Sequence, residues 1–224
     1  MVGGNGQLFH DAVVSGKTIC GPVIASAIEK ALKMGESNAC MKRIVAAPTA
    51  GACGVLPAVL VNYQKEKGTA DEQIVRALYT AAGIGQVVAA RAYIAGASGG
   101  CQAEIGTASA MAAGALTALG GGTPSQITHA AAMALKNLLG LVCDPVGGLV
   151  EVPCVKRNVI GSVNALSAAD MALAGIISRI PPDQVIDAMR EVGDQMHPSL
   201  RETGQGGLAN TPAAREWCAA QEEE

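Results

Sequence analysis

Apolar side chains recur at intervals of three and four residues along most of this 224-residue chain. That spacing places them on one face of an α-helix, so the pattern predicts a string of helices separated by glycine-rich loops. The predicted helices span residues 22–37, 56–68, 70–94, 103–122, 123–140, 162–178 and 181–196. Strands and helices do not alternate as they do in a Rossmann-type sheet, and the one extended piece expected is short, at residues 149–152. The expected fold is mainly α, a single helical domain over residues 1–224.

Local signals mark several of the helix ends. Gly35 and Gly68 are placed to stop the first two helices, because glycine adopts the backbone conformation that ends a helix. The acidic pair that begins at Asp71 suits the positive N-terminal end of the third helix. Thr123 is followed by proline, a combination typical of an N-cap and a first helical turn.

The composition explains why the helices are expected to pack closely. Half of the residues are hydrophobic but only 2% are aromatic, so the apolar side chains are mainly those of alanine, valine, leucine, isoleucine and methionine.

Residues 105–135 contain no Asp, Glu, Lys or Arg, which raises the question of a membrane span. A break at residues 120–126 divides this stretch, its residues are only weakly apolar, and no Trp or Tyr flanks it. We interpret it as helices buried inside a soluble protein, with no membrane partner.

The charge and the cysteine count narrow the function classes. The formal net charge is −3 and no basic run exceeds two residues, which argues against a nucleic-acid partner. The N-terminus carries no secretory signal pattern, and seven cysteines are an odd number without the density of a disulfide scaffold. Reduced thiols in the cytoplasm are the expectation. The acidic run at residues 222–224 is interpreted as a solvated tail.

Four segments are unlike ordinary connectors because they combine glycines with threonine, serine, asparagine or cysteine. They lie at residues 46–54, 96–106, 143–154 and 201–214. Glycine leaves room for backbone N–H groups to converge on an anion. The same glycines are also explained by tight turns and close helix packing. The segment at residues 96–106 lacks the ending and the preceding strand of a nucleotide-binding loop.

Three of the cysteines, Cys101, Cys143 and Cys154, lie in these irregular segments, whereas Cys20 and Cys40 share no pattern with them. Thiolates bind soft metals and iron–sulfur clusters. No CxxC pair is present, which disfavours a structural zinc site. The spacing alone leaves cluster binding open.

Taken together, four stretches resemble the α chain of bacterial iron–sulfur-dependent L-serine dehydratase, also called L-serine ammonia-lyase. The matching stretches are residues 44–60, 96–116, 143–175 and 201–212. They cover most of the chain in order, and several long motifs agree rather than one short pattern.

The resemblance implies a 4Fe–4S cluster held by Cys101, Cys143 and Cys154. Three thiolates on four irons leave one iron open, and that iron can act as a Lewis acid on the hydroxyl of L-serine. The implied reaction is elimination of water from L-serine to give pyruvate and ammonia, a step of amino-acid degradation that supplies gluconeogenesis.

Further site residues are expected around the cluster. Arg157 is a candidate to hold the substrate carboxylate as a bidentate fork, or else forms a surface ion pair. Lys156 is a candidate catalytic residue, although the identity of the base is left open. The candidate substrate-binding residues are Thr49, Ala50, Gly51, Ser98, Gly99 and Asn158.

In this family a β chain or β domain contributes part of the active site, including a histidine. We therefore expect a β-chain partner, a homo-oligomer, or both. The chain begins at MVGGNGQLF, where relatives carry further residues, so the N-terminus is expected to be truncated. Some relatives place a cysteine at the extreme C-terminus on the open iron; Cys218 either does the same or is a plain helical cysteine.

Three other functions remain open from the sequence. A non-catalytic or electron-transfer iron–sulfur protein needs a fourth fixed cysteine. A pyridoxal-phosphate lyase needs a reactive lysine and no iron. A membrane bundle needs detergent to stay in solution.

Overall fold

The computed structural model describes residues 1–222, so residues 223 and 224 of the expected acidic tail lie outside the described part. The helices are α1 (Asn5–Val14), α2 (Gly21–Ala39), α3 (Val55–Lys67), α4 (Asp71–Arg91), α5 (Gly96–Gly99), α6 (Thr107–Leu119), α7 (Pro124–Lys136), α8 (Cys154–Leu173), α9 (Pro182–Gln195) and α10 (Pro212–Glu222). No strand occurs within residues 1–222, and the one β-bridge there joins Cys143 to Arg201. The expectation of a mainly α fold is confirmed.

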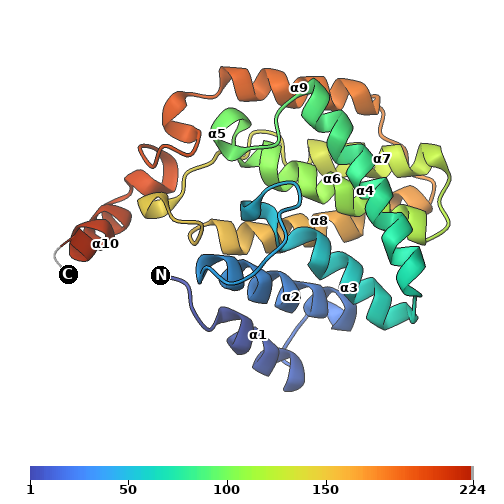
Figure 1. The fold of residues 1–224 in the computed structure, drawn as a ribbon, viewed down its shortest axis with the longest axis horizontal. Coiled ribbons are helices and arrows are strands. Elements are labelled where there is room, and N and C mark those ends of the chain that lie inside the picture. The colour runs from blue at the N-terminus through green and yellow to red at the C-terminus, as the bar shows by residue number, and fades with distance from the viewer. Residues whose placement is uncertain (223–224) are drawn as a thin grey trace.

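Helix α6 lies at the centre of the packing, between α4, α7 and α8 (Figure 1). Its residues 107–117 are all buried, and most of them are small: alanine, glycine, serine or threonine. Small side chains let the neighbouring helices approach closely, and their burial supplies the apolar free energy of the core. This burial explains why residues 107–117 carry no charge. Within residues 1–222, no helix combines the length and the apolarity that a membrane crossing requires.

Helix α2 continues past Gly35, where we expected it to end. Gly35 is buried inside the helix, and a Cβ added there would lie 3.2 Å from the Cα of Val155. The glycine is therefore a contact point at which α8 approaches α2 closely, and the helix runs on to Ala39. At Gly68 the expectation is confirmed, because this residue caps α3 with a φ of 63°.

Helix α8 begins eight residues earlier than expected, at Cys154 instead of residue 162, and ends at Leu173 rather than 178. Its first two turns contain β-branched residues and end at Gly161, which lowers their helix propensity, but burial against other helices overrides that preference. A Cβ on Gly161 would lie 2.9 Å from Ile105 Cγ2. At the other end, Gly175 with a φ of 88° terminates the helix.

The structure differs from the predicted secondary structure in several smaller respects. The expected extended piece at residues 149–152 forms no strand. Helix α1 was not predicted. The helix expected from residue 103 starts as a π-helical turn, Gln102–Gly106, which leads into α6. The Thr123 cap is confirmed, since Thr123 and Gln126 form a capping box at the start of α7.

Candidate active site

A cavity of about 250 Å³ lies where the four irregular segments meet. Each of the four contributes to its wall, although they are far apart in the sequence. The lining residues are Thr49, Ala50, Gly51, Ala95, Gly96, Glu104, Cys143, Pro145, Gly148, Val150, Cys154 and Glu202. Three candidate substrate-binding residues, Thr49, Ala50 and Gly51, are among them.

The structure brings Cys101, Cys143 and Cys154 to the same region, with exposed fractions of 1%, 2% and 7%. Cys143 and Cys154 line the cavity, and the Cys101 sulfur is hydrogen-bonded to Cys143. That bond lowers the pKa of Cys101 and raises the pKa of Cys143. Burial raises the pKa of Cys154 to about 12, with further contributions from the charges of Cys101 and Glu104. The three sulfurs therefore share one electrostatic environment.

Two glycines shape the chain around these cysteines. Gly100 has a φ of 76° and a ψ of 176°, a conformation that is essentially restricted to glycine, and it turns the chain immediately before Cys101. A Cβ on Gly96 would lie 2.7 Å from Cys143 Sγ. Any side chain at Gly96 would therefore occupy the place of the Cys143 sulfur.

Arg157 is buried behind the cysteines and does not line the cavity. Its Nη1 donates to Cys101 Sγ at 3.3 Å and to the carbonyl of Val142 at 2.7 Å. Its Nη2 forms an ion pair with Asp144 Oδ1 at 2.9 Å. The guanidinium is thus engaged by the protein itself, neither as a surface ion pair nor as a free fork in the cavity.

Asn158 follows Arg157 on α8 and is also buried away from the cavity. Its amide donates to the carbonyls of Gly51 and Cys154, at 2.7 and 2.9 Å, and its Oδ1 accepts from the N–H of Gly54 at 2.8 Å. These bonds use the whole side chain to fix the segment at residues 46–54 against α8. Asn158 positions the cavity wall rather than facing a ligand.

Three other expected site residues lie outside the cavity wall. Ser98 is exposed on α5, and Lys156 is exposed on α8. Gly99 is buried against Tyr93 and Ala103, where an added Cβ would lie 3.0 Å from each Cβ. None of the three is brought together with Cys143 or Cys154 in the cavity lining.

Cys218 on α10 lies beside the turn Val146–Gly148, since a Cβ on Gly147 would lie 3.4 Å from the Cys218 sulfur. Cys218 is not one of the residues that line the cavity, although Gly148 of the same turn is. No histidine of the described chain lines the cavity either.

Glu104 is a site residue that sequence reasoning missed. Its carboxylate accepts a hydrogen bond from the Thr49 hydroxyl, and its Oε2 lies 2.6 Å from where a Cβ on Gly51 would stand. Burial raises the pKa of Glu104, and the charge of Glu202 raises it further, against the lowering effect of Thr49. One sequence signal was available: Glu104 is the only Asp, Glu, Lys or Arg between Arg91 and Lys136.

Glu202 was missed as well. It lies at the exposed side of the cavity and has a φ of 64°, which is uncommon for a residue with a side chain. Its N–H donates to the carbonyl of Cys143 at 2.8 Å, and the Cys143 N–H donates to the carbonyl of Leu200 at 2.8 Å. These two bonds hold the loop of Glu202 directly against the Cys143 segment.

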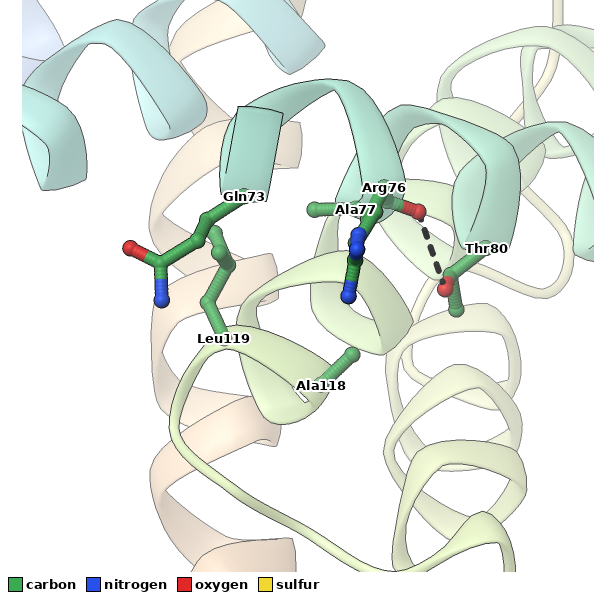
Figure 2. Close-up of a pocket in the computed structure, with 6 residues that line it drawn as sticks. All are labelled: Gln73, Arg76, Ala77, Thr80, Ala118 and Leu119. Carbon is green, nitrogen blue, oxygen red and sulfur yellow. Dashed lines mark hydrogen bonds between the residues drawn. The ribbon is translucent and has the colours of Figure 1, made fainter. Parts of the chain in front are cut away.

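A second cavity, of about 220 Å³, lies between α4 and the end of α6 (Figure 2). It is lined by Gln73, Arg76, Ala77, Thr80, Ala118 and Leu119. The Thr80 hydroxyl donates to the backbone carbonyl of Arg76 at 3.4 Å, the contact drawn in Figure 2. This lining contains no carboxylate, thiol or imidazole, so it offers neither metal ligands nor a base. The cavity with the cysteines is the candidate active site.

Comparison with known proteins shows the family of the chain. Residues 1–209 match the family model described as "Serine dehydratase alpha chain". The chain is 55% identical over 216 residues to a probable L-serine dehydratase, alpha chain, from Bacillus subtilis, covering 96% of this chain and 72% of that protein. A protein of the same description from Latilactobacillus sakei is 56% identical over 190 residues, covering 85% and 91%. The L-serine dehydratase, alpha chain, of Peptoniphilus asaccharolyticus is 49% identical over 211 residues, covering 94% and 72%.

Proposed function

Because this chain belongs to the family of serine dehydratase alpha chains, we propose that it is an L-serine ammonia-lyase, which eliminates water from L-serine to give pyruvate and ammonia. The proposed domain spans residues 1–224. The observation that carries the proposal is the meeting of four distant segments at one cavity, with Cys101, Cys143 and Cys154 buried together.

We further propose that these three cysteines hold a 4Fe–4S cluster. Thiolates are the ligands of such clusters, and the three come from irregular segments that can bend around a bulky group. Within residues 1–222, no three potential ligands are grouped closely enough for a single metal ion. In a bound cluster each of the three thiolates would bind a different iron, so the three sulfurs need not converge on one ion. When bound, the cluster supplies a Lewis acid that assists departure of the serine hydroxyl.

Three groups of residues around the cavity have different proposed roles. Arg157 holds Cys101 in place and favours its thiolate, since the guanidinium donates to the sulfur. The segment at Thr49, Ala50 and Gly51 forms the wall that binds the substrate carboxylate through backbone N–H groups, since the Thr49 hydroxyl already donates to Glu104. Asn158 keeps this wall in register with Cys154, because its amide bonds to both segments.

Elimination also requires a base that takes the α-proton while the hydroxyl leaves. The cavity wall formed by this chain contains no histidine and no lysine, and Lys156 points to solvent. We therefore propose that a separate β chain completes the site and supplies the base. The relatives named as alpha chains support the existence of such a partner. The aminoacrylate product then tautomerises and is hydrolysed to pyruvate and ammonia.

We also propose a cytoplasmic location, where a reducing environment keeps cysteines out of disulfides; none of the seven cysteines, all within residues 1–222, forms one in the structure. There the reaction would serve amino-acid degradation and deliver pyruvate to gluconeogenesis.

The proposal is tested by purifying the chain under anaerobic conditions and measuring iron, sulfide and pyruvate formation from L-serine, with and without a candidate β chain. The expected result is iron and sulfide in a ratio near that of a 4Fe–4S cluster, and serine-dependent pyruvate that rises when the β chain is added. A cluster that cycles between redox states but yields no pyruvate with either preparation would favour an electron-transfer protein. A lysine adduct that borohydride traps, in protein without iron, would favour a pyridoxal-phosphate lyase.

A further inference from the structure

We propose that Glu104, supported by Glu202, binds the α-ammonium group of the substrate and thereby selects amino acids over the corresponding hydroxy acids and carboxylic acids. This inference rests on the proposed function, since it assigns a ligand group within the same cavity.

The charge of the cavity wall is the first argument. Among its lining residues there is no Lys, Arg or His, and the two ionisable side chains other than the cysteines are both carboxylates, Glu104 and Glu202. A cavity with one sign of charge and low-dielectric walls concentrates ligands of the opposite sign. A free carboxylic acid is therefore disfavoured unless the same molecule also carries a positive group.

The partners of Glu104 are the second argument. Its side chain is mostly buried, yet within the described residues its one hydrogen-bond donor is the neutral Thr49 hydroxyl, and it forms no ion pair. A buried carboxylate without a cationic partner is costly. The Thr49 hydroxyl bonds to Oε1, which leaves Oε2 with acceptor capacity beside Gly51 in the cavity wall. An ammonium group supplies the missing donors and the missing charge.

The position of the two carboxylates is the third argument. Glu104 Oε2 lies against Gly51, and Glu202 Oε2 lies 3.4 Å from where a Cβ on Gly96 would stand. Both oxygens therefore face glycines of the cavity wall. The ammonium and the carboxylate of an amino acid are attached to the same carbon. A binding site for the ammonium thus belongs beside the proposed carboxylate site at residues 49–51, and Glu104 lies against Thr49 and Gly51.

The same arrangement raises an alternative role for Glu104, that of the base. The two roles make different kinetic predictions. Loss of a group that binds the substrate ammonium raises KM and weakens binding of unreactive analogues that carry the ammonium. Loss of a base lowers kcat and leaves the binding of such analogues unchanged.

The experiment uses the cluster-loaded chain together with its β chain. Binding of L-alanine, which has the ammonium but no hydroxyl, is compared with binding of propionate, which lacks the ammonium, by saturation-transfer NMR and by inhibition of serine turnover. For the unmodified protein we expect L-alanine to bind about tenfold or more tightly than propionate, the size expected for hydrogen bonds to a charged group. In Glu104→Gln we expect this preference to fall to near unity and KM for L-serine to rise by a similar factor. Glu202→Gln should produce a smaller change of the same sign, and Glu72→Gln, at an exposed site on α4, should produce none.

The outcomes separate this inference from the proposed function. A preference for L-alanine that persists in Glu104→Gln, or a fall in kcat with unchanged KM, overturns the role in ammonium binding. A preparation that makes no pyruvate but binds L-alanine in a Glu104-dependent way supports this role while contradicting the lyase function. Circular dichroism of Glu104→Gln establishes that the fold is intact, and Glu104→Asp, which keeps the charge, should retain part of the preference.

Discussion

One guanidinium joins a cysteine to a carboxylate in the interior of this protein: Arg157 lies 3.3 Å from the Cys101 sulfur through Nη1 and 2.9 Å from Asp144 through Nη2. Asp144 in turn accepts from the backbone N–H of Leu208 at 2.8 Å. The segments at residues 96–106, 143–154 and 201–214 are therefore connected through two buried side chains, Arg157 and Asp144.

The first prediction concerns this buried ion pair. Arg157→Met should lower the free energy of unfolding of the iron-free chain by about 3–5 kcal/mol, because it leaves Asp144 buried without its cation. Urea unfolding under anaerobic conditions measures the change. Adding Asp144→Asn to the same chain removes the unpaired charge and should restore part of the loss. Equal stabilities for the single variant and the unmodified chain would show that the pair contributes nothing.

The second prediction concerns the cluster ligands. Cys101→Ser, Cys143→Ser and Cys154→Ser should each lose most of the bound iron and sulfide, because a serine hydroxyl is a poor ligand for these irons. Cys20→Ser and Cys40→Ser are matched controls, since both cysteines are exposed and lie outside the cavity wall. Iron, sulfide and visible absorption are measured after anaerobic purification. A normal cluster spectrum in any of the first three variants removes that cysteine from the ligand set.

The third prediction uses two glycines in helices. Gly96→Ala should reduce iron content several-fold, because the new Cβ would stand 2.7 Å from the Cys143 sulfur and displace it. Gly83→Ala is the control: Gly83 lies mid-helix in α4 with nothing within 4 Å of an added Cβ. This control should keep its iron and raise the free energy of unfolding by about 1 kcal/mol, the difference in helix propensity between alanine and glycine. Equal iron contents in the two variants would contradict the proposed role of Gly96.

The fourth prediction is a pH dependence of stability. The pKa of Glu104 is raised above its ordinary value of 4.5, chiefly by burial, so the folded chain holds this proton more tightly than the unfolded chain. Between the two pKa values the folded state binds more protons, and the free energy of unfolding falls as the pH rises through that window. Glu104→Gln removes this contribution. The iron-free variant should therefore be more stable than the unmodified chain at neutral pH.

Urea midpoints measured from pH 4.5 upward test the sign. Glu29→Gln is the comparison, because Lys33 and His10 lower the pKa of Glu29 against the opposing effect of burial. That variant should lose stability at neutral pH. A Glu104→Gln chain that is less stable than the unmodified chain at neutral pH would contradict the assignment of a costly buried carboxylate.

Much of the helical architecture was predictable, because apolar spacing and local end signals act over a few residues. Thr123 and Gly68 define helix ends in the structure as they do in the sequence. The errors arose where tertiary contacts decide. Glycine commonly ends a helix, but Gly35 instead permits the close approach of α8. The spacing of residues along the sequence does not reveal such a contact between distant helices.

The candidate site likewise contains residues that the sequence predicted and residues that it could not predict. Family motifs pointed to Cys101, Cys143 and Cys154, which the fold brings into one region. They did not show that the Arg157 side chain is fully engaged by protein groups. Glu202 could not have been found from its neighbours in the sequence, because it reaches the cavity only through the pairing of its loop with Cys143.

Helix α8 carries Cys154, Arg157 and Asn158 within its first two turns. Because Arg157 and Asn158 follow Cys154 by three and four residues, the three side chains lie on the same side of the helix. An insertion or deletion of one residue inside α8 just after Asn158 would rotate the first two turns by about 100° relative to the packed remainder of the helix and turn Cys154, Arg157 and Asn158 away from their partners together. A design that transfers this site to another protein would therefore need to keep the first two turns of α8 as one helical unit, in the same orientation, before any of the four loops is changed.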